Sequence, residues 1–267
     1  MTPVKSENPL AVITGASTGI GYELAKKFAE NGYDLIIAAN ESRLADAQKN
    51  LKAIGTKVDR VQVDLATREG VEELYRQIKA KNRPVDSIAL NAGIGVSGKF
   101  IETNLEKELD LINLNVVSAV YLAKYVAKDM VEVGHGRILF TSSIVAVMPA
   151  SFMAVYGASK AFLYSLAEAL RVELKDAGVT VTALMPGPTD TQFFARANMG
   201  DTKVAHMDKD DPAMVAEQGF KALMEGKDHV LAGSLKVRLQ GLMAEIMPKT
   251  FSAGQHAKMA EPGSASR

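Results

Sequence analysis

The chain has 267 residues, of which 47% are hydrophobic, so it can form a sizeable core and is not expected to be disordered. Lysine plus arginine and aspartate plus glutamate both number 31, so there is no basic excess of the kind that binds nucleic acid or an anionic membrane. There is no cysteine, which excludes disulfides, thiolate metal sites and cysteine nucleophiles and fits a reducing compartment.

The N-terminal segment, residues 1–8, is polar and contains a proline. It lacks the apolar stretch of a signal peptide, and we expect no later run to reach the length of a membrane span. These features predict a cytoplasmic protein with no membrane and no nucleic-acid partner. No repeat or linker divides the chain, so residues 1–267 are expected to form a single domain with its core at about residues 9–233.

A glycine-rich turn follows the first predicted strand, residues 10–13, and precedes a helix that ends at Asn31-Gly32. Glycines at this place permit a tight turn and the close approach of a pyrophosphate. The helix N-terminus then offers N–H groups and a positive dipole end to that anion. We therefore expect the turn to bind a dinucleotide, through Gly15, Ser17, Thr18, Gly19, Ile20 and Gly21.

Apolar runs and helical patterns alternate along the rest of the chain. The expected strands are residues 34–39, 58–63, 85–90, 136–140, 179–185 and 229–232. The expected helices are residues 42–54, 67–81, 104–133 and 212–225, together with one that carries Tyr156 and ends at about residue 176. Strands that are apolar throughout are typical of a parallel sheet covered on both faces. The pattern predicts an α/β fold with a doubly wound parallel sheet.

Distinctive residues follow several of these strands where each strand ends. In an open parallel sheet, ligands bind beyond the carboxyl ends of the strands, so these residues are expected to meet at one site. After the glycine-rich turn, they are Asp64-Leu65, Asn91-Ala92-Gly93, Ser143 and Pro186-Gly187.

Tyr156 and Lys160 are four positions apart and lie on one face of a predicted helix. An ammonium close to a phenol favours the phenolate. A tyrosine with a lowered pKa can exchange a proton with a carbonyl or alcohol oxygen near neutral pH. The same spacing also arises in helices without any catalytic role. The pair indicates a reaction site only in combination with the residues at the strand ends.

Taken together, these motifs make residues 10–232 similar to the single-domain short-chain dehydrogenase/reductase family. The resemblance implies a Rossmann-type fold and hydride transfer between a nicotinamide and a carbonyl or secondary alcohol. It also implies a homodimer or homotetramer built on the helices that begin near Asn104 and Tyr156. A cofactor-binding regulatory or scaffold protein on the same fold is the alternative.

The resemblance assigns a role to each of four residues. It implies that Tyr156 is the general acid/base, that Lys160 lowers its pKa and binds the nicotinamide ribose, and that Ser143 holds the substrate oxygen. Ser142 competes with Ser143 for that role. Asn115 resembles the residue that holds a water between the lysine and solvent, and Asn113 is its rival.

The resemblance also implies the cofactor contacts. Asp64 would accept from the adenine amine beside the Leu65 backbone, and the segment at Asn91 would line the adenine ribose. Thr189 and Thr191, after Pro186-Gly187, would reach the carboxamide and the phosphates. An N-cap role before Gln192 is the competing interpretation of these threonines.

The end of the second strand leaves the choice between NAD and NADP open. Neither the usual acidic residue nor the usual basic residue is present after Ala38-Ala39. Asn40 and Arg43 could bind a 2′-phosphate, whereas an inward-facing Glu41 would oppose it. We expect Glu41 to face solvent and lean to NADP over NAD.

The residues expected around the substrate are mostly apolar and predict an uncharged, hydrophobic ketone, alcohol or acyl chain. They are Ile94, Gly95 and Val96, residues 145–153, and Phe193, Phe194 and Met199. Residues 192–211 are expected to form a mobile lid.

The four histidines have no metal-ligand spacing, so no metal site is expected. Residues 234–253 form an amphipathic segment expected to pack on the domain or on a subunit through Leu235, Leu239, Leu242 and Ile246, and residues 254–267 are expected to form a loose tail.

Overall fold

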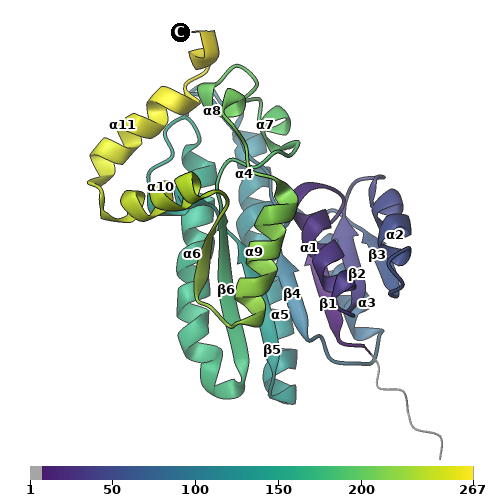
Figure 1. Ribbon diagram of the computed structural model, residues 1–267. Coiled ribbons are helices and arrows are strands. Elements are labelled where there is room, and N and C mark those ends of the chain that lie inside the picture. The colour runs from purple at the N-terminus through teal and green to yellow at the C-terminus, as the bar shows by residue number, and fades with distance from the viewer. Residues whose placement is uncertain (1–7, 267) are drawn as a thin grey trace, which may run out of the picture.

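The computed structural model describes residues 8–266 and contains one seven-stranded parallel sheet with the order β3-β2-β1-β4-β5-β6-β7 (Figure 1). The sequence prediction of a doubly wound parallel sheet is therefore confirmed. The strands are β1 (Leu10–Thr14), β2 (Asp34–Ala39), β3 (Val58–Gln62), β4 (Ser87–Leu90), β5 (Gly136–Thr141), β6 (Val179–Pro186) and β7 (His229–Ala232).

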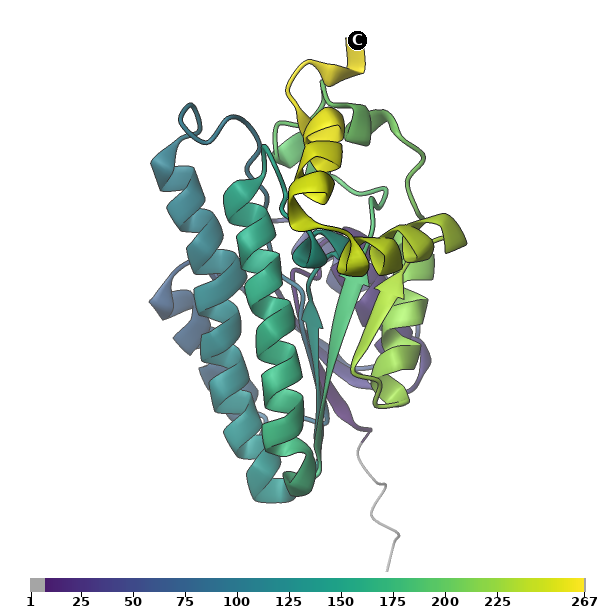
Figure 2. The ribbon, with the colours of Figure 1, turned by 90° about the vertical axis from the view of Figure 1, so that its left-hand side faces the viewer.

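Helices cover both faces of the sheet. The α-helices are α1 (Gly19–Glu30), α2 (Leu44–Lys52), α3 (Arg68–Lys79), α4 (Leu105–Ile112), α5 (Ser118–Val133), α6 (Ala154–Leu174), α7 (Phe193–Arg196), α8 (Lys203–His206), α9 (Pro212–Met224), α10 (Leu235–Ile246) and α11 (Lys249–Ala260). Short helical turns are η1 (Asn113–Val117), η2 (Ile144–Val147), η3 (Lys175–Ala177) and η4 (Ser264–Ser266). The long helix made of α4, η1 and α5 stands beside α6 on one face in Figure 2.

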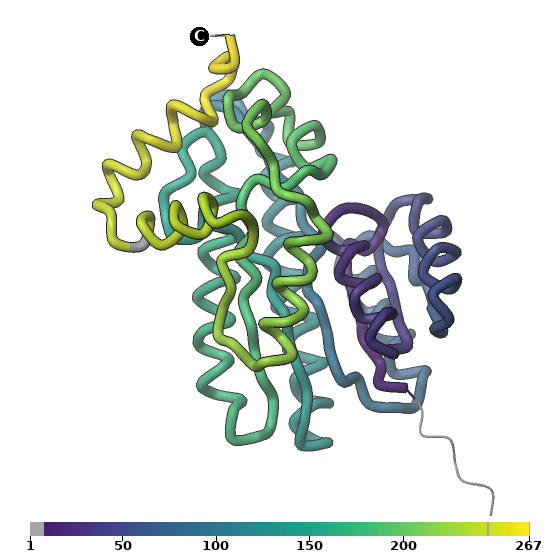
Figure 3. The backbone as a smooth tube through the Cα atoms, in the orientation of Figure 1, coloured from purple at the N-terminus to yellow at the C-terminus, as the bar shows by residue number. Residues whose placement is uncertain are grey.

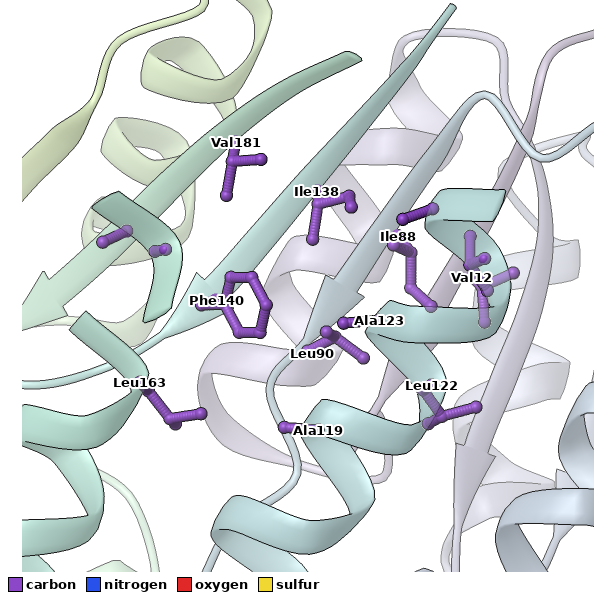
Figure 4. Close-up of a cluster of buried hydrophobic side chains, with 14 of the residues drawn as sticks. Val12, Ile88, Leu90, Ala119, Leu122, Ala123, Ile138, Phe140, Leu163 and Val181 are labelled. Carbon is purple, nitrogen blue, oxygen red and sulfur yellow. The ribbon is translucent and has the colours of Figure 1, made fainter. Parts of the chain in front are cut away.

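Alternate residues of each strand face opposite layers, because side chains in a strand alternate between its two faces. Val12 and Ile36 pack in the cluster that contains α3, α5 and α6, part of which is shown in Figure 4. Their neighbours Ile13 and Ile37 pack in the second cluster, against α1, α2 and α9. The central strands are therefore buried on both faces, which explains why they are apolar throughout.

The helix expected over residues 104–133 is interrupted by the turn η1, which is a π-helix. Helix α4 begins after Asn104, whose side chain accepts a hydrogen bond from the backbone N–H of Lys107, and α5 ends at Val133 with Gly134 as its C-cap. The whole stretch Leu105–Val133 is long and apolar enough to cross a membrane by length and composition. However, Leu122, Val126 and Met130 on its inner face are buried in the core beside the sheet, as expected for a core helix.

The C-terminal region differs from the sequence prediction. The tail expected from residue 254 is ordered as far as residue 266, because α11 buries Ser252, His256 and Ala260. In α10, Val237, Gly241 and Ala244 face the protein, whereas Leu235 and Ile246 are 80% and 86% exposed. The leucine stripe therefore does not pack on its own domain, and of the two expected contacts the one with a subunit stays a prediction. Figure 3 shows α10 and α11 on the side of the molecule opposite α2.

Candidate active site

A cavity of about 660 Å³ lies at the carboxyl ends of the strands and extends from the glycine-rich turn to α10 and α11. Its position beyond the strand ends is the one predicted from the sequence. The predicted site residues that line it are Gly15, Ser17, Thr18, Gly19, Ile20, Gly21, Asn40, Asp64, Leu65, Asn91, Ala92, Gly93, Ser143, Tyr156, Lys160, Pro186, Gly187, Thr189 and Thr191. Asn115 and Arg43 do not line it.

The glycine-rich turn lines the cavity and is packed so closely that its glycines cannot carry side chains. Gly15 has a φ of +67°, which favours glycine, and a Cβ on Gly21 would lie 2.2 Å from the carbonyl oxygen of Gly15. Thr18 is the N-cap residue of α1, but its side chain accepts no hydrogen bond from the helix. The first N–H groups of α1 therefore have no side-chain acceptor at Thr18. Such a helix N-terminus fits the pyrophosphate of a dinucleotide.

Asn91 joins this turn to the end of β4. Its Nδ2 donates to the carbonyl oxygen of Thr14 (3.2 Å), while the Thr14 hydroxyl accepts from the backbone N–H groups of Asn91 (2.9 Å) and Ala92 (3.0 Å). Strands β1 and β4 are neighbours at the point where the strand order reverses. The hydrogen bonds therefore fix the two strand ends between which a dinucleotide binds in such folds.

Burial dominates the electrostatics of Tyr156 and Lys160. Lys160 is 5% exposed, and burial lowers its pKa to about 8. Burial raises the pKa of Tyr156 to about 12, opposed by a hydrogen bond with Ser143. The Lys160 Nζ lies 5.7 Å from the Tyr156 ring centroid and donates to the carbonyl oxygen of Thr141 at 2.8 Å. Lys160 is not among the causes of this shift, so the prediction that Lys160 lowers the Tyr156 pKa is wrong for this structure.

The two adjacent serines have different partners. Ser142 is buried and donates to the carbonyl oxygen of Lys160 at 2.7 Å. Ser143 accepts from the backbone N–H of Val145 at 3.3 Å and donates to the carbonyl oxygen of Pro186 only at 3.4 Å. Because its donor bond is long, the Ser143 hydroxyl is the better placed of the two to turn toward a ligand oxygen.

Asn115 is fully buried in the π-helical turn, whereas its rival Asn113 is exposed. The Asn115 Oδ1 accepts from the backbone N–H of Ile94 (2.9 Å), and its Nδ2 donates to the Ile94 carbonyl oxygen (3.0 Å) and to Ser159 Oγ (3.1 Å). A Cβ on Gly93 would lie 3.0 Å from Asn115 Oδ1 and 3.4 Å from Lys160 Nζ. Asn115 thus holds the segment after β4 beside the lysine from behind the cavity wall.

The end of β2 corrects two predictions. Arg43 is exposed and lies outside the lining, because it is part of the turn that begins α2. Glu41, which was expected to face solvent, lines the cavity. It accepts a hydrogen bond from Ser17 at 3.1 Å and pairs with Arg196 at 2.6 Å. Arg196 comes from α7 in the expected lid, so sequence reasoning had no signal that would place it at the glycine-rich turn.

The expected lid contains the two short helices α7 and α8. Thr191 accepts from the backbone N–H of Phe193 at 3.3 Å, which fits the capping interpretation of this threonine. The Phe193 ring lies 5.1 Å from the ring of Tyr156, so the lid contacts the predicted proton donor. The predicted apolar residues that line the cavity are Ile94, Gly95, Val145, Met148, Met153, Phe193, Phe194 and Met199. Val96 was also expected there and does not line it.

The C-terminal wall of the cavity was missed by the sequence analysis. It consists of Gln240, Met243, Ala244, Met247, Ser252, Gln255, His256 and Met259. Among the described residues, Glu168, Asp228 and His229 have ligand atoms within 4.8 Å of one another. These three lie outside the cavity lining and are not part of the predicted site.

The model of the short chain dehydrogenase family matches residues 9–201. The chain belongs to this family. It is a short-chain dehydrogenase/reductase, an oxidoreductase that uses a nicotinamide cofactor, and its family members share the parallel sheet described above.

Relatives and solved structures agree with this assignment. An uncharacterized oxidoreductase of Staphylococcus saprophyticus is 31% identical, over 88% of this chain and 99% of its own length. The 3-ketodihydrosphingosine reductase of Bos taurus is 31% identical, over 94% of this chain and 80% of its own length. A short-chain dehydrogenase from Sphingobium yanoikuyae, solved in complex with NADPH, is 29% identical with a TM-score of 0.78, over 90% of this chain and 96% of its own.

Proposed function

We propose that this dehydrogenase/reductase transfers hydride between a nicotinamide cofactor and a carbonyl or secondary alcohol carbon, with Tyr156 as the general acid/base. One observation carries the proposal. Tyr156, Ser143 and Lys160 line the same cavity as the glycine-rich turn, so a dinucleotide held at the turn and a substrate held at the tyrosine would share one space.

The residues of the chain would act on the substrate oxygen and its proton. Ser143 would donate to the carbonyl oxygen and hold it beside the Tyr156 hydroxyl. With a pKa of about 12, Tyr156 carries its proton at neutral pH, which supports donation to the oxygen in the reductive direction. Lys160, with a pKa of about 8, is charged at neutral pH and would bind the nicotinamide ribose.

Other residues would hold the groups that react. Asn115 would position the segment at Ile94 and, through it, the wall beside Lys160. The tight turn from Gly15 to Gly21, which lines the cavity, and the uncapped start of α1 fit the pyrophosphate. When bound there, a nicotinamide dinucleotide supplies the hydride chemistry, and the protein orients the reactants and excludes water.

The substitution Tyr156→Phe tests the proposal. It removes one hydroxyl and keeps the ring, so we expect cofactor binding within about twofold of wild type and a loss of turnover of at least 100-fold. Tyr121→Phe is the matched control, because the Tyr121 hydroxyl bonds Glu72 and lies outside the cavity lining. Turnover by Tyr156→Phe at the wild-type rate would refute the mechanism.

We also propose NADP as the cofactor. Asn40 lines the cavity, and Arg196 adds a guanidinium that the end of β2 itself lacks. Glu41 works against a 2′-phosphate, but its charge is paired with Arg196. Two relatives, from Sphingobium yanoikuyae (29% identical) and Gluconobacter frateurii (27% identical), were solved with bound NADPH. They also support NADP as the cofactor.

Two substitutions separate the cofactors. Glu41→Gln removes the opposing charge, so we expect tighter NADPH binding and unchanged or weaker NADH binding. Arg196→Gln should weaken NADPH binding about tenfold or more and leave NADH binding nearly unchanged. Fluorescence titrations with both cofactors measure these changes. A wild-type preference for NADH, retained in Glu41→Gln, would contradict the choice of NADP.

The substrate that we propose is uncharged and hydrophobic. Apolar residues, among them Met148, Met153 and Phe193, surround the predicted reaction centre. Two related proteins act on ketones according to their names, the 3-ketodihydrosphingosine reductase and a bulky-bulky ketone specific alcohol dehydrogenase from Comamonas testosteroni. A panel of charged and uncharged ketones, followed by nicotinamide absorbance, tests this choice, and a preference for charged substrates would refute it.

We propose a homodimer or homotetramer that uses the outer faces of α4, α5 and α6. These helices expose large apolar side chains, among them Val117 (51%) on η1 and Val172 (72%) on α6. Exposed apolar patches of this kind mark protein interfaces. Light scattering at low micromolar concentration tests the assembly, and a monomeric mass would exclude it.

A further inference from the structure

Helices α10 and α11 form a wall of the cavity that lies outside the residues matched by the family model. The match ends at residue 201, whereas the wall consists of residues between 240 and 259. The glycine-rich turn lies at the other end of the same cavity, on the side of α1 and α2 (Figure 1). The C-terminal helices therefore shape the region beyond Tyr156, where the substrate and not the dinucleotide would lie.

The walls of this region are unusually rich in methionine. Seven of the twelve methionines of the chain line the cavity, namely Met148, Met153, Met199, Met207, Met243, Met247 and Met259. Methionine side chains are unbranched and polarisable, so a wall built from them can adapt its shape to a flexible apolar ligand. A rigid aromatic ligand would instead be matched by aromatic partners, which on this side are limited to Phe193 and Phe194 next to Tyr156.

The wall carries little charge. Between residues 199 and 259, His256 is the only ionisable residue among the described residues of the lining. Its Nδ1 lies 2.9 Å from the carbonyl oxygen of Ser151, and burial lowers its pKa, so the ring is neutral at pH 7. A buried charge is unfavourable unless it has a partner of opposite charge. The neutral His256 offers none, so an ionised substrate group would not be stabilised at this wall.

The wall is attached to the loop that precedes α6. Ser151 Oγ donates to the carbonyl oxygen of Ala253 at 3.0 Å, and the Lys249 Nζ donates to the carbonyl oxygen of Val147. These bonds hold the start of α11 beside Met148 and Met153, the methionines nearest in sequence to the catalytic tyrosine. The apolar lining therefore continues from the proposed reaction centre to the wall.

We propose that this methionine-lined chamber binds a long, unbranched alkyl or acyl chain of the substrate, whose carbonyl carbon is held at Tyr156. The inference rests on the proposed reductase function. It adds that α10 and α11 determine specificity for chain length. Each methylene buried in the chamber should then raise kcat/KM about fourfold, until the chain is longer than the chamber.

A series of straight-chain 2-alkanones, from 2-butanone to 2-tetradecanone, tests the proposal with the wild-type holoenzyme. We expect kcat/KM to rise with chain length and then level off. In Met247→Phe the chamber is shorter, so the ratio of kcat/KM for 2-dodecanone to that for 2-butanone should fall at least tenfold. Met214→Phe is the control, because Met214 lies on α9 outside the lining, and it should keep the wild-type ratio.

Binding is measured separately from turnover. The Tyr156→Phe holoenzyme with NADPH is titrated with the same ketones and followed by cofactor fluorescence, with circular dichroism to check that each variant is folded. If long chains bind tightly but the wild type does not turn them over, the proposed chamber stands and the proposed reductase function is refuted. The proposed chamber is refuted if the affinity for ketones does not depend on their chain length. It is also refuted if this dependence is the same in Met247→Phe and in the wild type.

Discussion

Replacing Lys160 by methionine should make the protein more stable and inactive. Lys160 is 5% exposed, and burial lowers its pKa from 10.5 to about 8. Keeping this ammonium charged in the folded state at pH 7 therefore costs about 3 kcal/mol of stability. Methionine has a similar shape and no charge, so Lys160→Met removes this cost. It also removes the hydrogen bond to the carbonyl oxygen of Thr141, which is worth about 1–2 kcal/mol.

The net expectation is a gain of about 1–2 kcal/mol in the free energy of unfolding at pH 7. Between pH 8 and 10.5 the unfolded chain holds the Lys160 proton more tightly than the folded one, so the wild type becomes more stable as pH rises through this window. The advantage of the variant should therefore shrink from pH 7 to pH 10. Below pH 8 the cost of the charge is fully present and the advantage is constant.

Urea unfolding at pH 7, 8, 9 and 10 measures the difference between the wild type and the variant. Lys52→Met is the control, because Lys52 is exposed, and its free energy of unfolding should stay within about 0.5 kcal/mol of the wild type at every pH. A Lys160→Met protein that is less stable than the wild type at pH 7, or whose difference does not change with pH, would refute the reasoning.

Three further substitutions test other parts of the structure. Asn115→Ala leaves the backbone N–H and carbonyl of Ile94 without partners, so it should cost about 2–4 kcal/mol in urea unfolding and lower kcat. Gly21→Ala places a Cβ 2.2 Å from the Gly15 carbonyl oxygen, so cofactor titration should show at least tenfold weaker binding. Gly254→Ala has free space around the new methyl group in α11 and should raise the melting temperature by about 2–4 °C; an unchanged or lower value would contradict the helical assignment of this segment.

The sheet and one end of the cavity could be predicted from the sequence, because their causes are local. Strands buried on both faces must be apolar throughout, and the turn after β1 must be rich in glycine, since a Cβ at Gly21 would meet the backbone. The positions of Tyr156 and Lys160 follow from helical spacing. Asn115 was identified through the family resemblance alone, since its partner Ile94 belongs to a loop that pattern reasoning could not place.

The other end of the cavity could not be predicted, because its causes are tertiary. In α10 two stripes compete, and the more hydrophobic one, with Leu235 and Ile246, is exposed. The buried stripe uses Gly241, where a Cβ would approach Leu231 within 2.8 Å, so close packing and not hydrophobicity decides which face is inward. Helix α11 is held by Lys249, which donates to the carbonyl oxygen of Val147, and by His256, which bonds the carbonyl oxygen of Ser151. Both are polar residues that a hydrophobic pattern does not reveal.

The π-helical turn Asn113–Val117 makes the site depend on the number of residues in a helix as well as on their identity. A π-helical turn contains one residue more than an α-helical turn would, and regular helix continues on both sides of it. Deleting a single residue at the exposed Asn113 would allow an unbroken α-helix to form. Helices α4 and α5 would keep nearly the same faces, because the deleted residue is the one that widens the turn. Asn115 lies inside the turn, so closing the turn would displace its side chain from Ile94, although every side chain named in the site would still be present.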